Sequence, residues 1–331
     1  MKAVVVEKYK QPLRMADVEE PAVGDRDVLI QVAATSLNQL DEKLRLAEFK
    51  PLLPYRAPFV LGHDVAGTVV EVGARVTQFS AGDRVYARPA DGRIGTFAER
   101  IAVPAEDVAL QPRGISAEEA ASLPLVALTA WQALVVIGRV KPSDKVLIQA
   151  GSGGVGTIAI QLAKHLGATV ATTVSPANAD LVRDLGADIV IDYRTKRFDE
   201  LLSGYDVVLD SLGPDSVLRS LSIVKPGGTV IGISGPPDPT FAREMGLNPL
   251  LRLLMAAVSR KVRSRAAKLG VTYRFLLMSA NGRQLAEITE LVDAGVLRPV
   301  VGKVIEFDDV PEALSFVGKD GTAGKTVARV T

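Results

Sequence analysis

The stretch Ala150-Gly151-Ser152-Gly153-Gly154-Val155-Gly156 decides the fold of this chain. An apolar segment, residues 145–149, precedes it, and residues 157–166 follow with apolar side chains at helical spacing. Three of the glycines fit G-x-G-x-x-G, a pattern that indicates dinucleotide binding when it lies between a strand and a helix. Such glycines allow a tight turn, the approach of a pyrophosphate and close packing of helix on strand. We therefore predict a dinucleotide-binding loop made by Gly151, Ser152, Gly153, Gly154, Val155 and Gly156.

The rhythm of strand, turn and helix repeats after this loop. Six strands are expected there, which is the number in the full dinucleotide fold, at residues 145–149, 169–174, 189–192, 206–210, 229–233 and 271–277. Residues 1–120 differ, because short Val- and Ile-rich runs alternate there with Gly, Pro and Asp. Residues 303–307 and 325–330 return to strand character. We predict an α/β chain with a β-rich domain built from both ends and a doubly wound parallel sheet between them.

Composition excludes several classes of protein. The 331 residues are too many for one ordinary core, and the 47% hydrophobic and 23% charged content is typical of globular chains. Lys and Arg number 39 against 38 Asp and Glu, so no general attraction to nucleic acid or anionic lipid is expected. No segment reaches the roughly 20 apolar residues of a membrane span, and no secretory signal is recognised. A cytoplasmic location is the expectation.

The residues after the second strand bear on the choice of cofactor. Sites for NAD usually place an acidic residue about 20 positions beyond the fingerprint, where it binds the ribose 2′-hydroxyl. This chain has Thr172, Thr173, Val174 and Ser175 there, with no carboxylate to repel a 2′-phosphate. The hydroxyl groups of Thr173 and Ser175 can donate hydrogen bonds to that phosphate. We therefore predict NADPH as the cofactor.

Further short motifs occur along the whole chain, namely Asn38-Gln39-Leu40-Asp41, Gly62-His63-Asp64-Val65-Ala66-Gly67, Gly95-Thr96-Phe97-Ala98-Glu99, residues 123–130, 186–193 and 205–213, and Gly324-Lys325-Thr326-Val327. With them the chain resembles the medium-chain dehydrogenase/reductase superfamily, and in particular its zinc-free quinone oxidoreductase branch, which includes zeta-crystallin and the alkenal/one reductases. The resemblance implies a GroES-like catalytic domain at residues 1–120 and 296–331, a Rossmann NADPH-binding domain at 121–295, and a homodimer.

The resemblance also assigns residues to the cofactor beyond the glycine loop. It implies contacts with the nicotinamide end, with its ribose and with the adenosine, and the residues concerned are Asn38, Thr129, Thr173, Ser175, Tyr193, Ser234 and Lys325. Zinc-dependent relatives carry cysteines near Asn38 and Leu125 as well as a histidine, whereas this chain has no cysteine and keeps only His63. Because catalytic zinc needs three protein ligands, we predict no metal site.

Few titratable side chains converge in the motifs, which suits chemistry carried by a nicotinamide better than hydrolysis. Reduction of a quinone or enone develops negative charge on a carbonyl oxygen, and Asn38 is our candidate donor to that oxygen. Tyr55, His63 or solvent would supply the second proton, and the sequence does not choose among them. His63 is interpreted either as a packing histidine or as a proton donor.

We predict an NADPH-dependent, zinc-independent reductase of a small quinone or α,β-unsaturated carbonyl compound. Three alternatives stay open: an enoyl-thioester reductase, a zinc alcohol dehydrogenase, and an NADPH-binding sensor or structural protein without turnover. Other features are interpreted as structural, namely an ion pair between Asp41 and Arg45 and a surface or capping role for His165. Residues 248–269 are expected to form one or two helices whose basic run is a solvated face or subunit contact, or else a lid or anionic-ligand site; this run is Arg260, Lys261, Arg263, Arg265 and Lys268.

Overall fold

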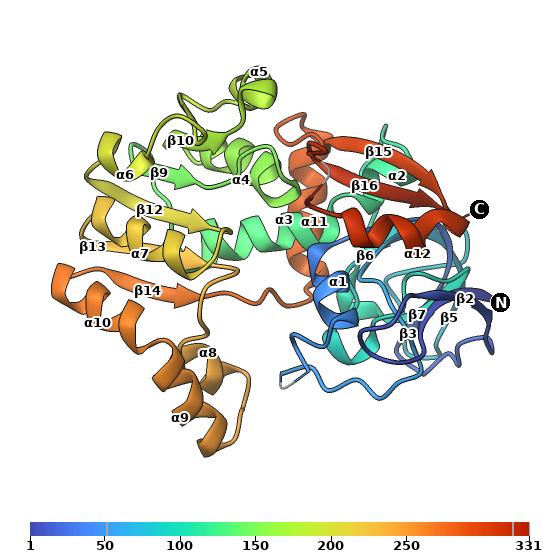
Figure 1. Ribbon diagram of the computed structural model, residues 1–331. Coiled ribbons are helices and arrows are strands. Elements are labelled where there is room, and N and C mark those ends of the chain that lie inside the picture. The colour runs from blue at the N-terminus through green and yellow to red at the C-terminus, as the bar shows by residue number, and fades with distance from the viewer. Residues whose placement is uncertain (51, 320, 331) are drawn as a thin grey trace. The chain divides into compact units, whose positions relative to one another are not determined.

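The computed structural model describes residues 1–50, 52–319 and 321–330. By its internal contacts the chain forms two compact units (Figure 1). Unit 1 comprises Met1–Leu128 with Ser279–Thr331, and unit 2 comprises Thr129–Met278. Unit 1 therefore contains both ends of the chain, as the strand character of the C-terminal segment predicts. Helix α3 (Pro124–Trp131) begins in unit 1 and ends in unit 2.

Unit 2 is built on a six-stranded parallel sheet with the order β11-β10-β9-β12-β13-β14. All six predicted strands are present, and their order is that of the full dinucleotide fold. The direction of strand order reverses between β9 and β12, where such folds bind their ligand at the carboxyl ends of the strands. The strands are β9 (Lys145–Ile148), β10 (Thr169–Val174), β11 (Ile189–Asp192), β12 (Tyr205–Asp210), β13 (Val224–Gly232) and β14 (Thr272–Phe275).

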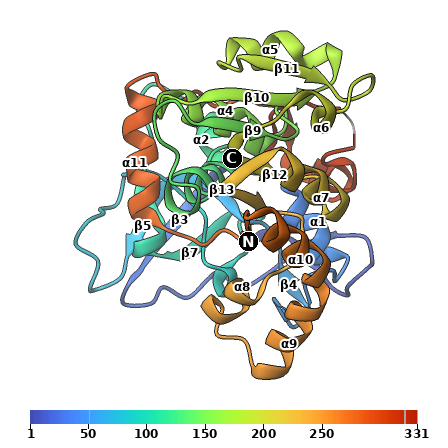
Figure 2. The same ribbon diagram turned by 90° about the vertical axis from the view of Figure 1, so that its left-hand side faces the viewer.

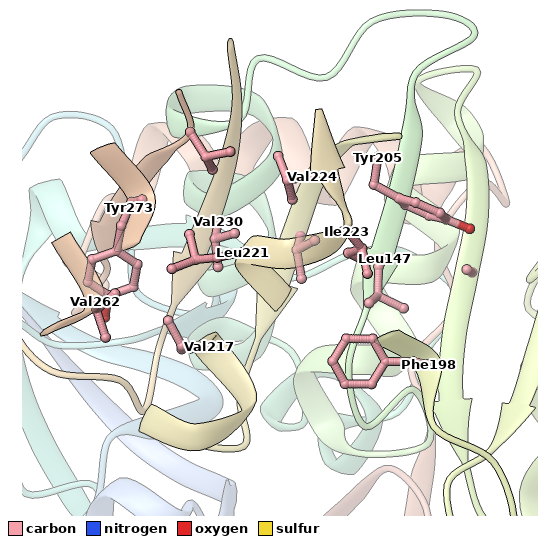
Figure 3. Close-up of a cluster of buried hydrophobic side chains, with 14 of the residues drawn as sticks. Leu147, Phe198, Tyr205, Val217, Leu221, Ile223, Val224, Val230, Val262 and Tyr273 are labelled. Carbon is pink, nitrogen blue, oxygen red and sulfur yellow. The ribbon is translucent and has the colours of Figure 1, made fainter. Parts of the chain in front are cut away.

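Helices cover this sheet and bury its apolar residues. Strand β10 is buried along all but its first residue, as expected of a parallel strand with both faces covered. Figure 3 shows Val217 and Leu221 from α7 beside Val230 from β13, within one buried cluster that also holds Leu147, Phe198 and Tyr273. The helices of unit 2 are α4 (Gly154–His165), α5 (Ala179–Asp184), α6 (Phe198–Leu201), α7 (Pro214–Ile223), α8 (Pro239–Glu244), α9 (Pro249–Val258) and α10 (Arg260–Leu269).

Unit 1 contains two sheets that are mainly antiparallel. The larger has the order β15-β16-β3-β5-β6-β8, with β7 also paired to β3, and the smaller has the order β2-β1-β4. Val28, Ile30 and Val32 alternate along β3 into a buried core shared with β5 and β6. The strands are β1 (Lys2–Val6), β2 (Arg14–Asp17), β3 (Asp27–Ser36), β4 (Phe59–Val60), β5 (Asp64–Val72), β6 (Arg84–Ala87), β7 (Arg100–Pro104), β8 (Val108–Leu110), β15 (Val301–Glu306) and β16 (Lys325–Arg329).

One helix belongs to a different part of the chain from the one we expected. Residues 121–295 were assigned to the dinucleotide-binding domain, yet α11 (Gly282–Asp293) packs on β8 and falls in unit 1. The hydroxyl of Tyr86 donates to the carbonyl of Leu285 at 2.7 Å, and a Cβ on Gly282 would lie 2.5 Å from the carbonyl oxygen of Val108. These close contacts, rather than chain continuity with β14, decide where α11 belongs. The other helices of unit 1 are α1 (Gln39–Arg45), α2 (Ala117–Ala121) and α12 (Val310–Ala313).

The segment between β13 and β14 forms helices α8, α9 and α10. One or two helices were expected within residues 248–269, and the structure has two there, α9 and α10. Helix α10 packs on α7 and β14, whereas α8 and α9 project beyond the edge of the sheet that β14 forms (Figures 1 and 2). None of the helices within the described residues has both the length and the apolar character needed to cross a membrane.

Candidate functional site

The glycine loop of unit 2 joins β9 to α4, as predicted. Gly153 is the N-cap residue of α4 and offers no side-chain acceptor to the first turn of the helix. The first N–H groups of a helix have no partner within it, so this end is suited to bind an anion. Ala150 adopts a positive φ of 54°, which turns the chain out of β9, and Gly151 N then donates to Thr173 O at 3.0 Å.

The three glycines of the fingerprint differ in what requires them. A Cβ on Gly151 would lie 2.1 Å from Thr172 Oγ1, and one on Gly156 would lie 2.4 Å from Ala150 O and 2.7 Å from Gly151 Cα. Those two are therefore required by packing inside the protein. A Cβ on Gly153 would meet only Ala150 O, at 3.3 Å, which is a tight contact but not a clash. The protein alone does not demand glycine at position 153, whereas a pyrophosphate close to the backbone would.

The hydroxyl of Thr173 is hydrogen-bonded to the residues at the start of the glycine loop. Its hydroxyl donates to Gln149 Oε1 at 2.6 Å and accepts from Ala150 N at 3.2 Å, and its side chain is buried. The hydroxyl that we assigned to a 2′-phosphate is thus already bonded within the unit. Gln149 was missed in the sequence, although it ends the segment before the loop; its buried Nε2 has no hydrogen-bond partner among the described residues.

The other residues assigned to the adenosine lie at the ends of β10 and β11. Ser175 follows β10 and is partly exposed, and Asn178 Nδ2 donates to Ser152 Oγ at 3.2 Å. Tyr193 follows β11 and is 58% exposed. Ser152, Ser175 and Tyr193 are therefore all accessible to a ligand. His165 ends α4 with its side chain exposed, as expected of a surface residue.

Thr129 and Ser234 also lie in unit 2, Thr129 buried in α3 and Ser234 partly exposed after β13.

The buried carboxylate of Asp210, at the end of β12, was not singled out in the sequence. It accepts hydrogen bonds from Ser216 Oγ at 2.7 Å and Ser220 Oγ at 2.8 Å. Burial raises the pKa of Asp210, and these two hydroxyls oppose that rise. Asp210 therefore links the end of β12 to two serines of α7.

In unit 1 the buried carboxylate of Asp64, the first residue of β5, organises a group of polar side chains. Ser36 Oγ donates to Asp64 Oδ2 at 2.6 Å, and Asn38 Nδ2 donates to the same oxygen at 2.8 Å. The backbone N–H of Leu125 donates to Oδ1 at 2.7 Å. The ammonium of Lys325 lies 3.4 Å from Oδ2. We call Ser36, Asn38, Asp64 and Lys325 the Asp64 cluster.

Lys325 is the cation of this cluster and comes from β16. Its Nζ donates to Leu37 O at 2.9 Å and also to Asn38 Oδ1. Burial lowers the pKa of Lys325, while the negative charges of Asp64 and Asp41 oppose that change. Asn38 is held on both sides, because its oxygen faces this ammonium and its Nδ2 also donates to Ser36 O at 3.3 Å. The structure thus brings Asn38 and Lys325 together, two residues that the sequence assigned separately.

His63 and Asp41 form a second buried pair next to the Asp64 cluster. Their Nδ1 and Oδ1 atoms are 2.6 Å apart, and because a carboxylate only accepts, Nδ1 carries the hydrogen. The Nε2 atom of His63 is buried without a partner among the described residues. The ion pair expected between Asp41 and Arg45 is therefore wrong. Arg45 instead binds Glu42, one turn away, at 2.7 Å.

Tyr55 lies outside both groups. Its hydroxyl donates to Asp91 O, and its ring stacks on Phe59 with centroids 5.1 Å apart. Burial raises the pKa of Tyr55. The hydroxyl would have to leave Asp91 before it could give its proton to a substrate.

Two family models match the chain. One is described as a zinc-binding dehydrogenase and covers residues 185–327, and the other as an alcohol dehydrogenase GroES-like domain and covers residues 24–113. Among curated proteins, the NAD(P)H oxidoreductase RTN4IP1 of Danio rerio mitochondria is 35% identical over 100% of this chain and 91% of its own. The NADPH-dependent alkenal/one oxidoreductase of Arabidopsis thaliana chloroplasts is 33% identical over 94% of this chain and 74% of its own.

A solved structure is similar throughout. The quinone oxidoreductase from Coxiella burnetii has a TM-score of 0.87 and 29% sequence identity, with 100% of this chain and 99% of that chain covered. The likeness therefore includes both units and is not confined to the dinucleotide fold.

The description of the first family model raises the question of whether zinc fits this chain. At the positions where zinc-dependent relatives have ligands, unit 1 presents the amide of Asn38, the side chain of Leu125 and His63, whose Nδ1 is already bonded to Asp41. The positive charge next to Asp64 and Asn38 is the ammonium of Lys325. Zinc needs several anionic or imidazole ligands and would be repelled by this ammonium, so these residues do not fit it. Within the described residues no group of three His, Cys, Asp or Glu side chains is arranged to hold a metal ion.

Proposed function

The chain belongs to the medium-chain dehydrogenase/reductase superfamily, and from that premise we propose that it reduces small quinones and α,β-unsaturated carbonyl compounds with NADPH and without zinc. The observation that carries the proposal is Gly153, the one fingerprint glycine that internal packing does not require. The names of the Arabidopsis and Coxiella proteins support the choice of an enone or quinone as acceptor.

The residues of the glycine loop would hold the pyrophosphate at the start of α4. Residues 172–175 carry no acidic side chain, which supports NADPH, as does the partly exposed hydroxyl of Ser175. Thr173 would act indirectly, since its hydroxyl is bonded to Gln149 and Ala150. Ser152, Tyr193, Thr129 and Ser234 remain proposed contacts. The bound nicotinamide supplies the hydride.

We propose that the Asp64 cluster stabilises the negative charge that develops on the carbonyl oxygen. Lys325 polarises the Asn38 amide by donating to its oxygen, which makes the Nδ2 hydrogens better donors. The bond from Nδ2 to Ser36 O, at 3.3 Å, is the longer of the two that this nitrogen makes. It is therefore the one that a substrate oxygen would replace at least cost. In this proposal Asn38 contacts the substrate, and Lys325 and Asp64 are positioning residues.

For the second proton, we propose His63 ahead of Tyr55. Asp41 fixes the imidazole and leaves Nε2 without a partner among the described residues, whereas the Tyr55 hydroxyl is bonded and its pKa is raised by burial. To give a proton, His63 would act as the imidazolium, with Nδ1–H bonded to Asp41 and Nε2–H as the donor. His63→Gln keeps a polar side chain of similar size that cannot deliver a proton. If His63 delivers the proton, kcat falls in this variant while NADPH affinity is retained; if His63 only packs, kcat does not change, and solvent is the donor.

The test of the proposal is NADPH oxidation by the purified protein with a quinone, a short enone, an acyl thioester and a simple aldehyde. Each assay is repeated with NADH and with a chelator. We expect turnover of quinone or enone that prefers NADPH and is unaffected by the chelator. Faster turnover of the thioester would identify an enoyl-thioester reductase. NADPH binding without any turnover would favour a sensor or structural protein and would remove Asn38 and His63 from the catalytic residues.

Two further proposals follow from the superfamily. We propose a homodimer, which light scattering on the purified protein tests directly, and a cytoplasmic location, which fractionation of the source cells tests. A monomer at all concentrations would contradict the first. Recovery of the protein only within an organelle or outside the cell would contradict the second.

A further inference from the structure

Helix α9 exposes an unusual row of aliphatic side chains. Leu250 is 75% exposed, Leu253 69%, Leu254 51% and Val258 55%. Their spacing of three and four residues places them on one face of the helix, together with the exposed Ala257. The opposite face holds the buried Met255. A contiguous apolar face toward water differs from scattered exposed residues and marks an interaction surface.

Positive charge is concentrated in the segment that contains this face. Residues 245–269 contain six Lys and Arg and no Asp or Glu. Removing those six from the total of 39 leaves 33 basic against 38 acidic residues in the rest of the chain. The near-neutral composition therefore conceals a local cationic segment on a chain that is otherwise acidic. The exposed members on α10 are Arg260, Lys261, Arg265 and Lys268.

Contacts within the chain hold α9 and α10 in place. Asn248 caps α9 by accepting a hydrogen bond from Leu251 N at 3.0 Å. Ser259 joins α9 to α10, since its hydroxyl donates to Met255 O at 2.7 Å and accepts from Arg263 Nε at 3.1 Å. Val262 and Ala266 anchor α10 in the core of unit 2, and α9 projects beyond β14 (Figures 1 and 2). The apolar side chains of α9 and the basic side chains of α10 thus lie on two helices that are bonded to each other and anchored in unit 2 through α10.

We propose that α9 and α10 bind an anionic lipid surface. In this arrangement α9 lies in the plane of the interface with Leu250, Leu253, Leu254 and Val258 among the upper acyl chains. The basic side chains of α10 contact the headgroup phosphates. An apolar face next to Lys and Arg is the pattern of interfacial helices, and neither α9 nor α10 is long enough to span a bilayer.

Charge argues against the simplest other occupant, a second copy of the chain. A twofold interface brings the same patch of each subunit together, so two cationic segments without a carboxylate would face each other. An acidic protein would satisfy the charge. The apolar face, however, is an open row of aliphatic side chains on a projecting helix, which suits an interfacial position better than a specific pocket.

The first experiment is flotation of the full-length protein with phosphatidylcholine vesicles, with and without phosphatidylserine, in the absence of cofactor. We expect flotation with the anionic vesicles only, weakened by high salt because the charges act through screened electrostatics. Equal flotation with both vesicles would overturn the electrostatic part of the proposal. No flotation with either would overturn it entirely. Neither result depends on reductase activity.

Paired variants separate the apolar and the basic surfaces. Leu250→Ser with Leu253→Ser should lower the vesicle-bound fraction about tenfold, whereas Leu201→Ser, at a side chain 57% exposed on α6, should leave it unchanged. Lys261→Glu with Arg265→Glu should abolish binding. The matched pair Lys8→Glu with Lys303→Glu makes the same charge change at exposed positions in unit 1 and should retain it. Loss of binding in the control variants as well would contradict a site on α9 and α10.

Two further measurements test the other possible occupants of this face, a second copy of the chain and an acidic protein. A shift from dimer to monomer in Leu250→Ser with Leu253→Ser, seen by light scattering, would assign this face to a second copy and overturn the proposal. Soluble polyglutamate should compete only weakly with vesicles, because it offers no apolar phase. Binding of polyglutamate as tight as that of vesicles, and unaffected by the Leu→Ser changes, would overturn the proposal in favour of an acidic protein.

Discussion

The ammonium of Lys325 lies 3.4 Å from the carboxylate of Asp64, and only 7% and 0% of the two side chains are exposed. The pair joins β16, near the end of the chain, to the first residue of β5. Asn38 receives its hydrogen bond from this ammonium and donates to this carboxylate. The C-terminal strand therefore contributes a buried charged side chain to the Asp64 cluster as well as a strand to the sheet of unit 1.

Removal of the cation should destabilise unit 1. In Lys325→Met the buried oxygens of Leu37, Asn38 and Asp64 lose the donor that Nζ supplies, and we expect a loss of about 3 to 5 kcal/mol in the free energy of unfolding. Lys303→Met, at an exposed residue of the adjacent β15, should change it by less than about 0.5 kcal/mol. Urea denaturation followed by far-UV circular dichroism measures both. Equal midpoints for the two variants would show that Asp64 does not need this partner.

The lowered pKa of Lys325 predicts a dependence of stability on alkaline pH. Burial places its folded-state pKa below the unfolded value of 10.5. Between these two values the unfolded chain binds more protons, so this residue makes stability rise with pH in that window. Below the folded-state pKa its penalty is complete and constant. The difference in unfolding free energy between the wild type and Lys325→Met should therefore grow in the window as pH rises, and a constant difference would argue against a shifted pKa.

The same titration should appear in catalysis. If Lys325 polarises Asn38, kcat should fall as the ammonium loses its proton at alkaline pH. In Lys325→Arg the charge persists to higher pH, so the alkaline decrease should shift upward. A decrease at the same pH in both proteins would mean that another group controls it.

Substitutions in the glycine loop should separate effects on the stability of unit 2 from effects on NADPH binding. Gly156→Ala places a Cβ where Ala150 O and Gly151 Cα already lie, so it should lower the stability of unit 2 by about 1 to 3 kcal/mol. Gly153→Ala meets only one atom at 3.3 Å and should fold nearly normally, yet bind NADPH at least about tenfold more weakly. Gly153→Asp adds charge and should abolish binding. Thermal unfolding and NADPH fluorescence titration measure the two effects, and unchanged affinity in Gly153→Asp would refute the loop assignment.

The sequence predicts the parallel sheet well because each strand is a short apolar run between glycine-rich turns, a pattern that depends only on neighbours along the chain. Contacts between distant segments were the source of the errors. Asp41 was paired with Arg45 by helical spacing, but its carboxylate is hydrogen-bonded to His63, which lies 22 positions away in the sequence. Thr173 was assigned to the cofactor from its place in the sequence, and that contact stays a proposal; the structure adds that its hydroxyl donates to Gln149, the residue after β9. Lys325 and Asp64, 261 positions apart, carry no local signal of their pairing.

We expect Asp238 to stabilise the segment of unit 2 that carries α9. One of its oxygens accepts from Thr240 N at 2.6 Å and Phe241 N at 3.1 Å, which caps α8, and the other accepts from Phe275 N at 2.6 Å, which fixes the end of β14. Asp238→Ala leaves three backbone donors without this acceptor, so we expect a loss of about 3 kcal/mol from unit 2. Asn248→Ala removes a single cap from α9 and should cost about 1 kcal/mol. Urea denaturation ranks the two variants, and amide hydrogen exchange should rise at Thr240, Phe241 and Phe275 in the first alone. If exchange instead rises only within α8, the carboxylate caps the helix without holding the strand, and α8 and β14 are fixed by the packing of Phe241 on Phe275, whose ring centroids are 4.9 Å apart.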